Sequence, residues 1–259
     1  MTLLNFSLPM VQAAVLIFAR VGAILLTAPL FSSGSIPVHV KVGLSFMLAV
    51  IVFPLVSVND TFVLLPIASL GIAMAGEVLI GVIIGFTARL LFAAVQLAGQ
   101  LVGFQMGFGI VNVIDPQTSA QVSIIAQFEN IITLLIFMAV NAHHWFIMAI
   151  AKSFEVVPLL AFSFTNSLME ALVRLSCDMF VVAAKVAAPI IAILLFTSVA
   201  LGLLARTVPQ MNIFIVGFPL KLAIGLLAVG LTLPLLSTLL RNLFQGLGED
   251  IFVLMRLMT

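Results

Sequence analysis

The chain has unusually few charged residues. Only 7% of its 259 residues are Asp, Glu, Lys or Arg, and the net charge at pH 7 is +1. Soluble domains carry about 25% charged residues. A chain that is 64% hydrophobic, with a mean hydropathy of +1.38, is instead typical of an integral membrane protein. Because there is no basic excess, nucleic acid is excluded as a plausible partner.

Cysteine and catalytic motifs are equally scarce. Cys177 is the only cysteine, which excludes a disulfide framework within the chain and a cysteine-rich metal site. His143 and His144 are adjacent, so they would project to different sides of a helix, and no third ligand stands at a useful spacing. No phosphate-binding loop, dinucleotide-binding turn or nucleophile elbow occurs. We therefore expect no enzyme, no metal and no cofactor. The first residues lack the basic region of a cleavable signal peptide, so the first hydrophobic segment is expected to be retained.

Long hydrophobic stretches take the place of these motifs. None alternates like the strands of a barrel, so the sequence predicts an all-α fold of long, kinked helices and helical hairpins, as in polytopic membrane proteins. A hydropathy count gives about six spans of roughly 20 residues each. The stretch 67–109 is long enough for two spans or for one very long helix. The expected segments are 8–31, 42–59, 67–109, 119–151, 167–205 and 211–240, with a loop over 152–166 and an amphipathic surface helix over 241–259.

The basic residues do not orient these segments. In a six-span arrangement, positive residues are shared almost equally between the two sides, whereas membrane proteins usually concentrate them on one. We therefore expect some apolar segments to pack against partner proteins instead of lipid. The residues are Lys41 and Arg206 on one side, and Lys152, Arg241 and Arg256 on the other.

A polar, glycine-rich stretch over 96–121 interrupts the hydrophobic pattern. Gly99, Gly103 and Gly107 recur every fourth residue, so on a helix they form one stripe against which another backbone can pack closely. Backbone that leaves a helix in such a chain must be buried in protein or line a wet cavity, because lipid cannot satisfy its polar groups. The stretch is therefore a candidate pore element. The residues that indicate a turn or loop are Gly109, Asn112, Asp115 and Pro116.

Glu77, Gly81, Gly85 and Arg89 are spaced by four and share one helix face. Intramembrane charges are costly and usually face an interior, a partner or water. We expect a close helix contact whose two ends are fixed by ion pairs to neighbouring subunits. Alternatively, the two charges, about 18 Å apart on a helix, lie near the ends of a span and reach outward. The same two interpretations apply to Glu129, Asp178 and Lys185.

A set of short motifs, spread from about residue 20 to residue 225, carries a family resemblance. They are Glu77-x3-Gly81-x3-Gly85, AAVQLAGQ at 93–100, GFQMGFG at 103–109, Asp115-Pro116, Arg20 with Pro29, Asn141-Ala142-His143, Arg206-x2-Pro209-Gln210-x-Asn212 and GFPLK at 217–221. Each is weak alone, but their order and intervals together resemble the FliR family. Proteins of this family are components of the flagellar type III protein-export gate, with counterparts in virulence injectisomes.

The resemblance implies a non-enzymatic subunit that lines and plugs a channel for unfolded export substrates. It also implies a hetero-oligomer with FliP-like and FliQ-like subunits, an FlhB-like protein and rod proteins nearby, contact with membrane lipid, and a place in the flagellar basal body at the bacterial inner membrane. Residues 1–166 would be FliP-like, and 167–259 would be a FliQ-like hairpin with an amphipathic tail.

Within this resemblance, the loop over about 106–121 would be the channel plug. Its residues are Met106, Gly107, Phe108, Gly109, Ile110, Val111, Asn112, Val113, Ile114, Asp115 and Pro116. The residues expected in subunit packing are Glu77, Gly81, Gly85, Arg89, Gly99, Gly103, Arg206, Pro209, Gln210 and Lys221.

Two other functions stay open at the level of sequence. A small secondary transporter or ion-channel subunit would use intramembrane charges as a relay, although the chain shows no convincing internal repeat of the transporter kind. A membrane scaffold that lines no channel is the other. The relay residues would be Glu77, Arg89, Asp178 and Lys185.

Overall fold

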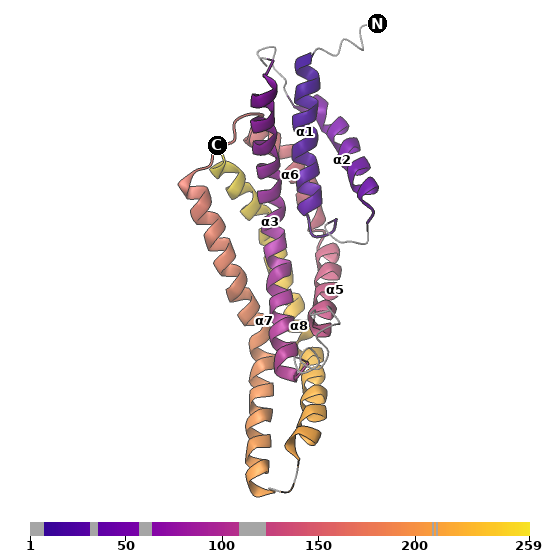
Figure 1. Cartoon of the computed structure of the whole chain (residues 1–259), viewed down its shortest axis with the longest axis vertical. Helices are drawn as coiled ribbons and strands as arrows, with labels where there is room; N and C mark the ends of the chain where they lie inside the picture. The colour runs from indigo at the N-terminus through magenta and orange to yellow at the C-terminus, as the bar shows by residue number, and fades with distance from the viewer. Residues whose placement is uncertain (1–7, 32–35, 57–63, 109–122, 209, 211) are drawn as a thin grey trace. The chain divides into compact units, whose positions relative to one another are not determined.

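A computed structural model describes residues 8–31, 36–56, 64–108, 123–208, 210 and 212–259. Within these residues every regular element is helical, which confirms the predicted all-α fold. The elements are α1 (Leu8–Thr27), α2 (Val38–Val52), the short 3-10 helix η1 (Phe53–Leu55), α3 (Ile67–Met106), α5 (Ile124–Ala139), α6 (His143–Val156), α7 (Asn166–Thr207) and α8 (Ile213–Leu257) (Figure 1).

The helix lengths agree with the predicted membrane character. Five of the described helical segments are long and apolar enough to cross a membrane, namely α1, α2 with η1, α3, α7 and α8. The pair α5 and α6, bent by 63°, makes a sixth if it forms one span. Of the two alternatives for the third segment, one very long helix is right, because α3 runs unbroken for 40 residues.

The bend between α5 and α6 has a local cause. Asn141 has a φ of 58°, a left-handed conformation that ends a helix and that asparagine tolerates better than most residues. In the sequence, Asn141, His143 and His144 interrupt the apolar pattern of the expected segment 119–151 at this point. It also predicts a loop over 152–166, and here the structure differs, because α6 continues to Val156.

The C-terminal residues belong to α8. The predicted amphipathic pattern over 241–259 is present, but it forms the end of a 45-residue helix rather than a helix of its own. Hydrogen bonds tie this end to the segment between α6 and α7: the Ser163 N–H donates to the Met258 carbonyl at 2.8 Å, and Thr165 Oγ1 donates to the Leu257 carbonyl at 2.8 Å. The buried residues of this stretch, at helical spacing, are Phe244, Leu247, Gly248, Ile251, Leu254, Met255 and Met258.

The chain forms two compact units, and neither is continuous in sequence. The first comprises 1–90, 141–175 and 244–259, and the second comprises 91–140 and 176–243. Parts of α3, α7 and α8 therefore belong to both units. The expected division after residue 166 falls at the start of α7, and the likeness of the two halves to FliP and FliQ stays a prediction.

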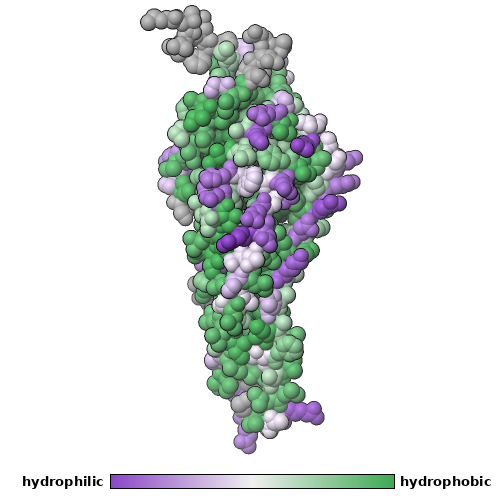
Figure 2. Space-filling view, turned by 180° about the vertical axis from the view of Figure 1, so that it is seen from behind, coloured by the Kyte–Doolittle hydropathy of each residue, from purple (hydrophilic) through white to green (hydrophobic). Residues whose placement is uncertain are grey.

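Much of the apolar surface is left uncovered. Phe104, Phe196 and Leu231 are 74%, 73% and 80% exposed. Figure 2 shows hydrophobic residues over much of the visible face, with hydrophilic residues gathered in patches between them. Contiguous apolar surface of this extent marks contact with lipid or with other proteins, since it is unfavourable in water.

Candidate functional site

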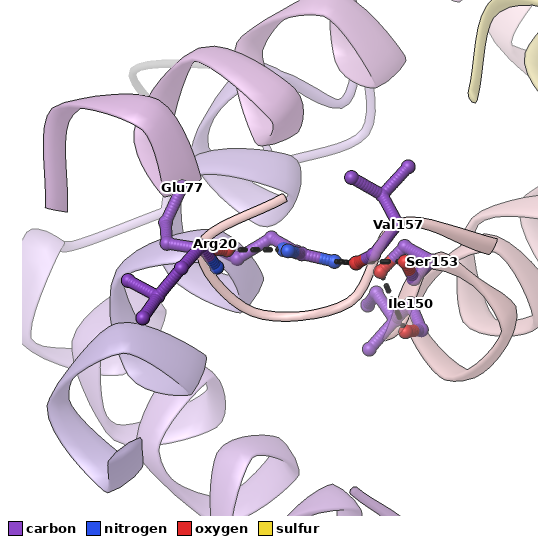
Figure 3. Close-up of polar contacts among 6 residues, drawn as sticks. Arg20, Glu77, Ile150, Ser153 and Val157 are labelled. Atoms are coloured by element: carbon purple, nitrogen blue, oxygen red, sulfur yellow. Dashed lines mark hydrogen bonds and ion pairs between the residues drawn. The ribbon is translucent and has the colours of Figure 1, made fainter. Parts of the chain in front are cut away.

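The first unit is organised around a buried ion pair. Arg20 on α1 and Glu77 on α3 are 0% and 1% exposed, and Arg20 Nε donates to Glu77 Oε2 at 2.5 Å (Figure 3). Taking one such charge out of water costs several kcal/mol, so each requires the other. The sequence predicts that Glu77 pairs with a neighbouring subunit. In the structure its partner lies in the same chain.

Arg20 also fixes the end of α6. Its Nη1 donates to the carbonyls of Ser153 at 2.8 Å and Val157 at 2.7 Å, and its guanidinium lies 4.3 Å from the ring centroid of Phe154. The Ser153 carbonyl also accepts from the Val157 N–H at 2.9 Å, whereas the Val157 carbonyl lies beyond the last helical residue, where a basic side chain is a favourable cap. One arginine therefore joins α1, α3 and the end of α6 (Figure 3).

Glu77 holds the segment after α6 as well. Its Oε1 accepts a hydrogen bond from the Leu160 N–H at 3.3 Å. Leu160 has a φ of 69°, which is strained for a residue with a side chain. A charge-assisted hydrogen bond is among the stronger kinds and offsets part of that strain.

The two glycines that follow Glu77 on its helix face pack against α1. A Cβ at Gly81 would lie 2.6 Å from Ala23 Cβ and 2.7 Å from the Arg20 carbonyl oxygen. A Cβ at Gly85 would lie 2.5 Å from Thr27 Cβ. The predicted close helix contact is therefore present, and its partner helix is α1. A role for these residues in contacts between subunits stays a prediction.

Gly99 and Gly103, further along α3, pack against α5 in the second unit. A Cβ at Gly99 would lie 2.5 Å from Ala126 Cα, and one at Gly103 would lie 3.1 Å from Ser123 Cβ. Ser123 Oγ donates to the Gly99 carbonyl at 3.3 Å. Small residues are what allow the start of α5 to approach α3 at backbone distance.

The predicted plug loop leaves α3 through a regular helix ending. Gly107 has a φ of +100°, its N–H donates to the Phe104 carbonyl at 3.0 Å, and the Phe108 N–H donates to the Gly103 carbonyl at 3.1 Å. These two bonds, with a left-handed glycine after the last helical residue, define a Schellman motif. Glycine is required at this position because a side chain would be strained at this φ.

The base of the loop is seated against α8. Met106 is 0% exposed, and its Cγ and Cε would each lie 2.7 Å from a Cβ at Gly225. Gly107 faces the Phe218 ring, whose Cδ2 would lie 3.1 Å from an added Cβ. The start of the predicted plug loop is therefore held by side-chain packing on a proline-containing helix, since Pro219 lies within α8.

Four other predicted site residues lie within the described residues. Arg89 on α3 and Arg206 in the last turn of α7 are exposed, as is Gln210, and Lys221 on α8 is half-buried. No ion pair joins any of them among the residues described. Pro209 and the predicted plug residues Gly109, Ile110, Val111, Asn112, Val113, Ile114, Asp115 and Pro116 lie outside the described residues.

Sequence reasoning missed that Arg20 is the partner of Glu77. The available signal was one basic residue within an apolar segment and one acidic residue within another, since buried opposite charges usually pair. For metal binding, the described part of the chain holds no group of three His, Cys, Asp or Glu side chains close enough to act together. His143 and His144 contact each other with ring centroids 4.3 Å apart.

These features define the class of the chain as an all-helical membrane protein with closely packed glycine helices and a large uncovered apolar surface. Residues 11–247 match the family "Bacterial export proteins, family 1". The chain is 36% identical to the flagellar biosynthetic protein FliR of Bacillus subtilis, covering 93% of this chain and 94% of that protein. It is 34% identical to FliR of Escherichia coli, covering 87% and 86%. The chain therefore belongs to this family of bacterial export proteins, whose FliR members are its relatives.

Proposed function

We propose that the chain is a non-enzymatic subunit of the flagellar type III protein-export gate, and that the loop beginning at Met106 helps to close the channel. Family membership supports the export role, because the matched relatives are flagellar biosynthetic proteins. Assembly with FliP-like and FliQ-like subunits, near an FlhB-like protein and the rod, is part of the proposal. So is a location in the basal body at the inner membrane.

The packing of the start of the loop against α8 is the observation that supports the gating role. Met106 and Gly107 are fixed against Gly225 and Phe218, so the loop starts from a defined position on α3. A plug must begin at a fixed point if it is to return to the same closed position. The uncovered apolar surface of α7 and α8 supports the assembly, because such a surface requires lipid or partner helices.

The runner-up, a transporter with a charge relay, is less well supported. Glu77 is occupied by Arg20 and by the Leu160 N–H, which leaves it poorly placed to pass ions or protons. Arg89 is exposed on α3. A relay needs polar groups that can exchange partners. Glu77 is held by its hydrogen bonds, and Arg89 lies at the surface.

The test is deletion of residues 107–116 in cells that assemble the export apparatus. We expect the complex to assemble and the membrane to become leaky to ions or small molecules. Complex yield is measured by affinity purification, and leakage by a membrane-impermeant dye. A deletion variant that assembles normally and keeps the membrane as tight as wild type would refute the plug. If FliP-like and FliQ-like proteins did not co-purify with the wild-type chain, the proposed assembly would be refuted.

A further inference from the structure

Glu129 on α5 carries a carboxyl group into the interior of the second unit. It is 2% exposed, and its Oε2 has no hydrogen-bond partner among the residues described. Oε2 would lie 2.9 Å from a Cβ at Gly99, so the carboxyl group faces the backbone of α3. The Gly99 N–H is used within that helix, because backbone N–H groups inside an α-helix donate to the carbonyl four residues earlier. At the point of contact, α3 therefore offers this oxygen no free donor.

Among the described residues, no cation pairs with this carboxyl group. They include every Lys, Arg and His of the sequence, and none of these forms an ion pair with Glu129. Within α5, Glu129 is the only charged residue. On α3, the charged residue closest in sequence to Gly99 is Arg89, ten positions earlier and about 15 Å along the helix. An ionised Glu129 would therefore be a buried charge that the chain itself does not compensate.

The pocket beside Glu129 adds little that would stabilise a negative charge. Its volume is about 20 Å³, and its other lining residues come from α7 and α8. Among these lining residues Lys185 is the one charged residue, and its side chain is exposed, while the Thr232 hydroxyl donates within α8 at 2.9 Å. Between Lys221 and Arg241, α8 has no charged residue. About 10–15 Å³ is enough for one water molecule, which can hydrogen-bond a carboxylate but cannot balance its charge.

Protonation removes the charge without any further group. An isolated carboxylate is so costly to bury that such a group takes up a proton instead. We propose that Glu129 is a proton-binding site, which holds the side chain as a neutral carboxylic acid in the folded second unit. The acid has one O–H to donate. Pro189, in the pocket wall, has no N–H, so the Lys185 carbonyl four residues earlier lacks its helical partner and can accept that bond, directly or through one water. The site does not depend on the export role.

The pH dependence of chemical unfolding tests the proposal on the purified full chain in detergent. Above about pH 5 an unfolded glutamate has lost its proton. If the folded state still holds that proton, stability falls as pH rises, and this one group raises the unfolding equilibrium constant by up to about tenfold per pH unit until the folded state releases the proton too. Glu129→Gln, which keeps the shape of the neutral acid, should lose this contribution. Asp178→Asn, at an exposed position on α7, should keep it. Equal pH dependence in wild type and Glu129→Gln would overturn the proposal, and Glu129→Met gives the same comparison if the Gln variant does not fold.

Infrared difference spectra of the assembled export complex identify the protonation state directly. Replacing Glu129 with Gln should remove a band of a protonated carboxyl group and leave the carboxylate bands unchanged. Loss of a carboxylate band instead would overturn the proposal, because it would mean that a cation from outside the chain, such as a basic side chain of a partner subunit, balances an ionised Glu129. The spectra of Asp178→Asn, which removes an exposed carboxylate from the same unit, provide the reference for that outcome.

Discussion

Arg20 and Glu77, 57 positions apart in the sequence, form a fully buried ion pair whose arginine also caps the end of α6. The pair thus joins three helices of the first unit at one point. Removing either residue leaves the other charge unpaired in a low-dielectric site. Substitution of Arg20 or Glu77 should therefore cost more stability than substitution of an exposed charged residue.

Replacing Arg20 with Met should therefore destabilise the chain by about 3–5 kcal/mol, since a buried carboxylate is left unpaired. Removing both charges in Arg20→Met/Glu77→Leu should recover part of that loss. The measurement is the thermal midpoint of the purified chain, together with its level in membranes. Arg89→Met, at an exposed position on α3, should change stability by no more than about 0.5 kcal/mol. Equal midpoints for the Arg20 and Arg89 variants would contradict a structural role for the pair.

Gly81 and Gly85 offer a second comparison within one helix. Gly81→Ala and Gly85→Ala should each cost about 1–3 kcal/mol, because the added methyl has no space against α1. Gly71→Ala, also on α3 but with nothing within 4 Å of its added Cβ, should stabilise the helix by up to about 1 kcal/mol. Chemical unfolding of the three variants measures the difference. If all three were stabilised alike, α1 and α3 would not pack as closely as described.

Gly107 should tolerate substitution in the order Asn, then Ala, then Val. Its φ of +100° penalises any side chain, least for asparagine and most for a β-branched residue. The cost for Ala is about 1–2 kcal/mol. Hydrogen exchange at the amides of residues 107 and 108 should speed up in the same order, since these amides make the two helix-ending bonds. Unchanged exchange in the Val variant would mean that the Schellman ending is not formed.

Met106 and Gly225 should behave as a coupled pair. Gly225→Ala should be tolerated, because the Met106 thioether can move aside, while Gly225→Leu should displace Met106 and, under the proposed plug role, increase dye leakage. Shortening the neighbour in Met106→Ala/Gly225→Leu should restore tightness toward wild type. Dye leakage and complex yield are measured together. If leakage in the double variant equalled the sum of the leakage in the two single variants, Met106 and Gly225 would not act as a packed pair.

The end of α8 can be tested by truncation. Removing 258–259 deletes a 0% exposed methionine and the carbonyl that accepts from Ser163, so we expect a loss of about 2–5 kcal/mol. Removing Thr259 alone, which is exposed, should cost far less. The midpoint of each truncated chain decides between them. A tolerated double deletion would show that the tie between α8 and residues 163–165 is dispensable.

The sequence was informative wherever a rule of local chemistry applied. Unbroken apolar stretches gave the long helices, and the spacing of Gly81, Gly85, Gly99 and Gly103 indicated close helix contacts, which are present. The sequence does not identify the residue that pairs with Glu77. Nothing in the neighbourhood of Glu77 indicates that its counter-charge is Arg20, because pairing between distant segments depends on the three-dimensional arrangement of helices.

Helix boundaries show the same limit. Pro219 and Pro234 each remove one backbone hydrogen bond, yet α8 continues past both. The predicted segment 211–240 also runs past both prolines, but its predicted end at residue 240 is wrong, because α8 continues to Leu257. Burial of the face that includes Phe244 and Leu247 favours the continuous helix. The pocket beside Glu129 is likewise lined by residues from α5, α7 and α8, which sequence spacing alone does not bring together.

The order of the segments has a consequence for synthesis. The first unit comprises residues 244–259 together with 1–90 and 141–175, so we expect it to form only after residues 244–259 have left the ribosome. Until then, the apolar site that buries Leu254 and Met258 is empty. Truncated or stalled chains would expose that apolar site to quality-control proteases. We therefore expect chains that stop before residue 244 to be degraded faster than chains that include residues 244–259.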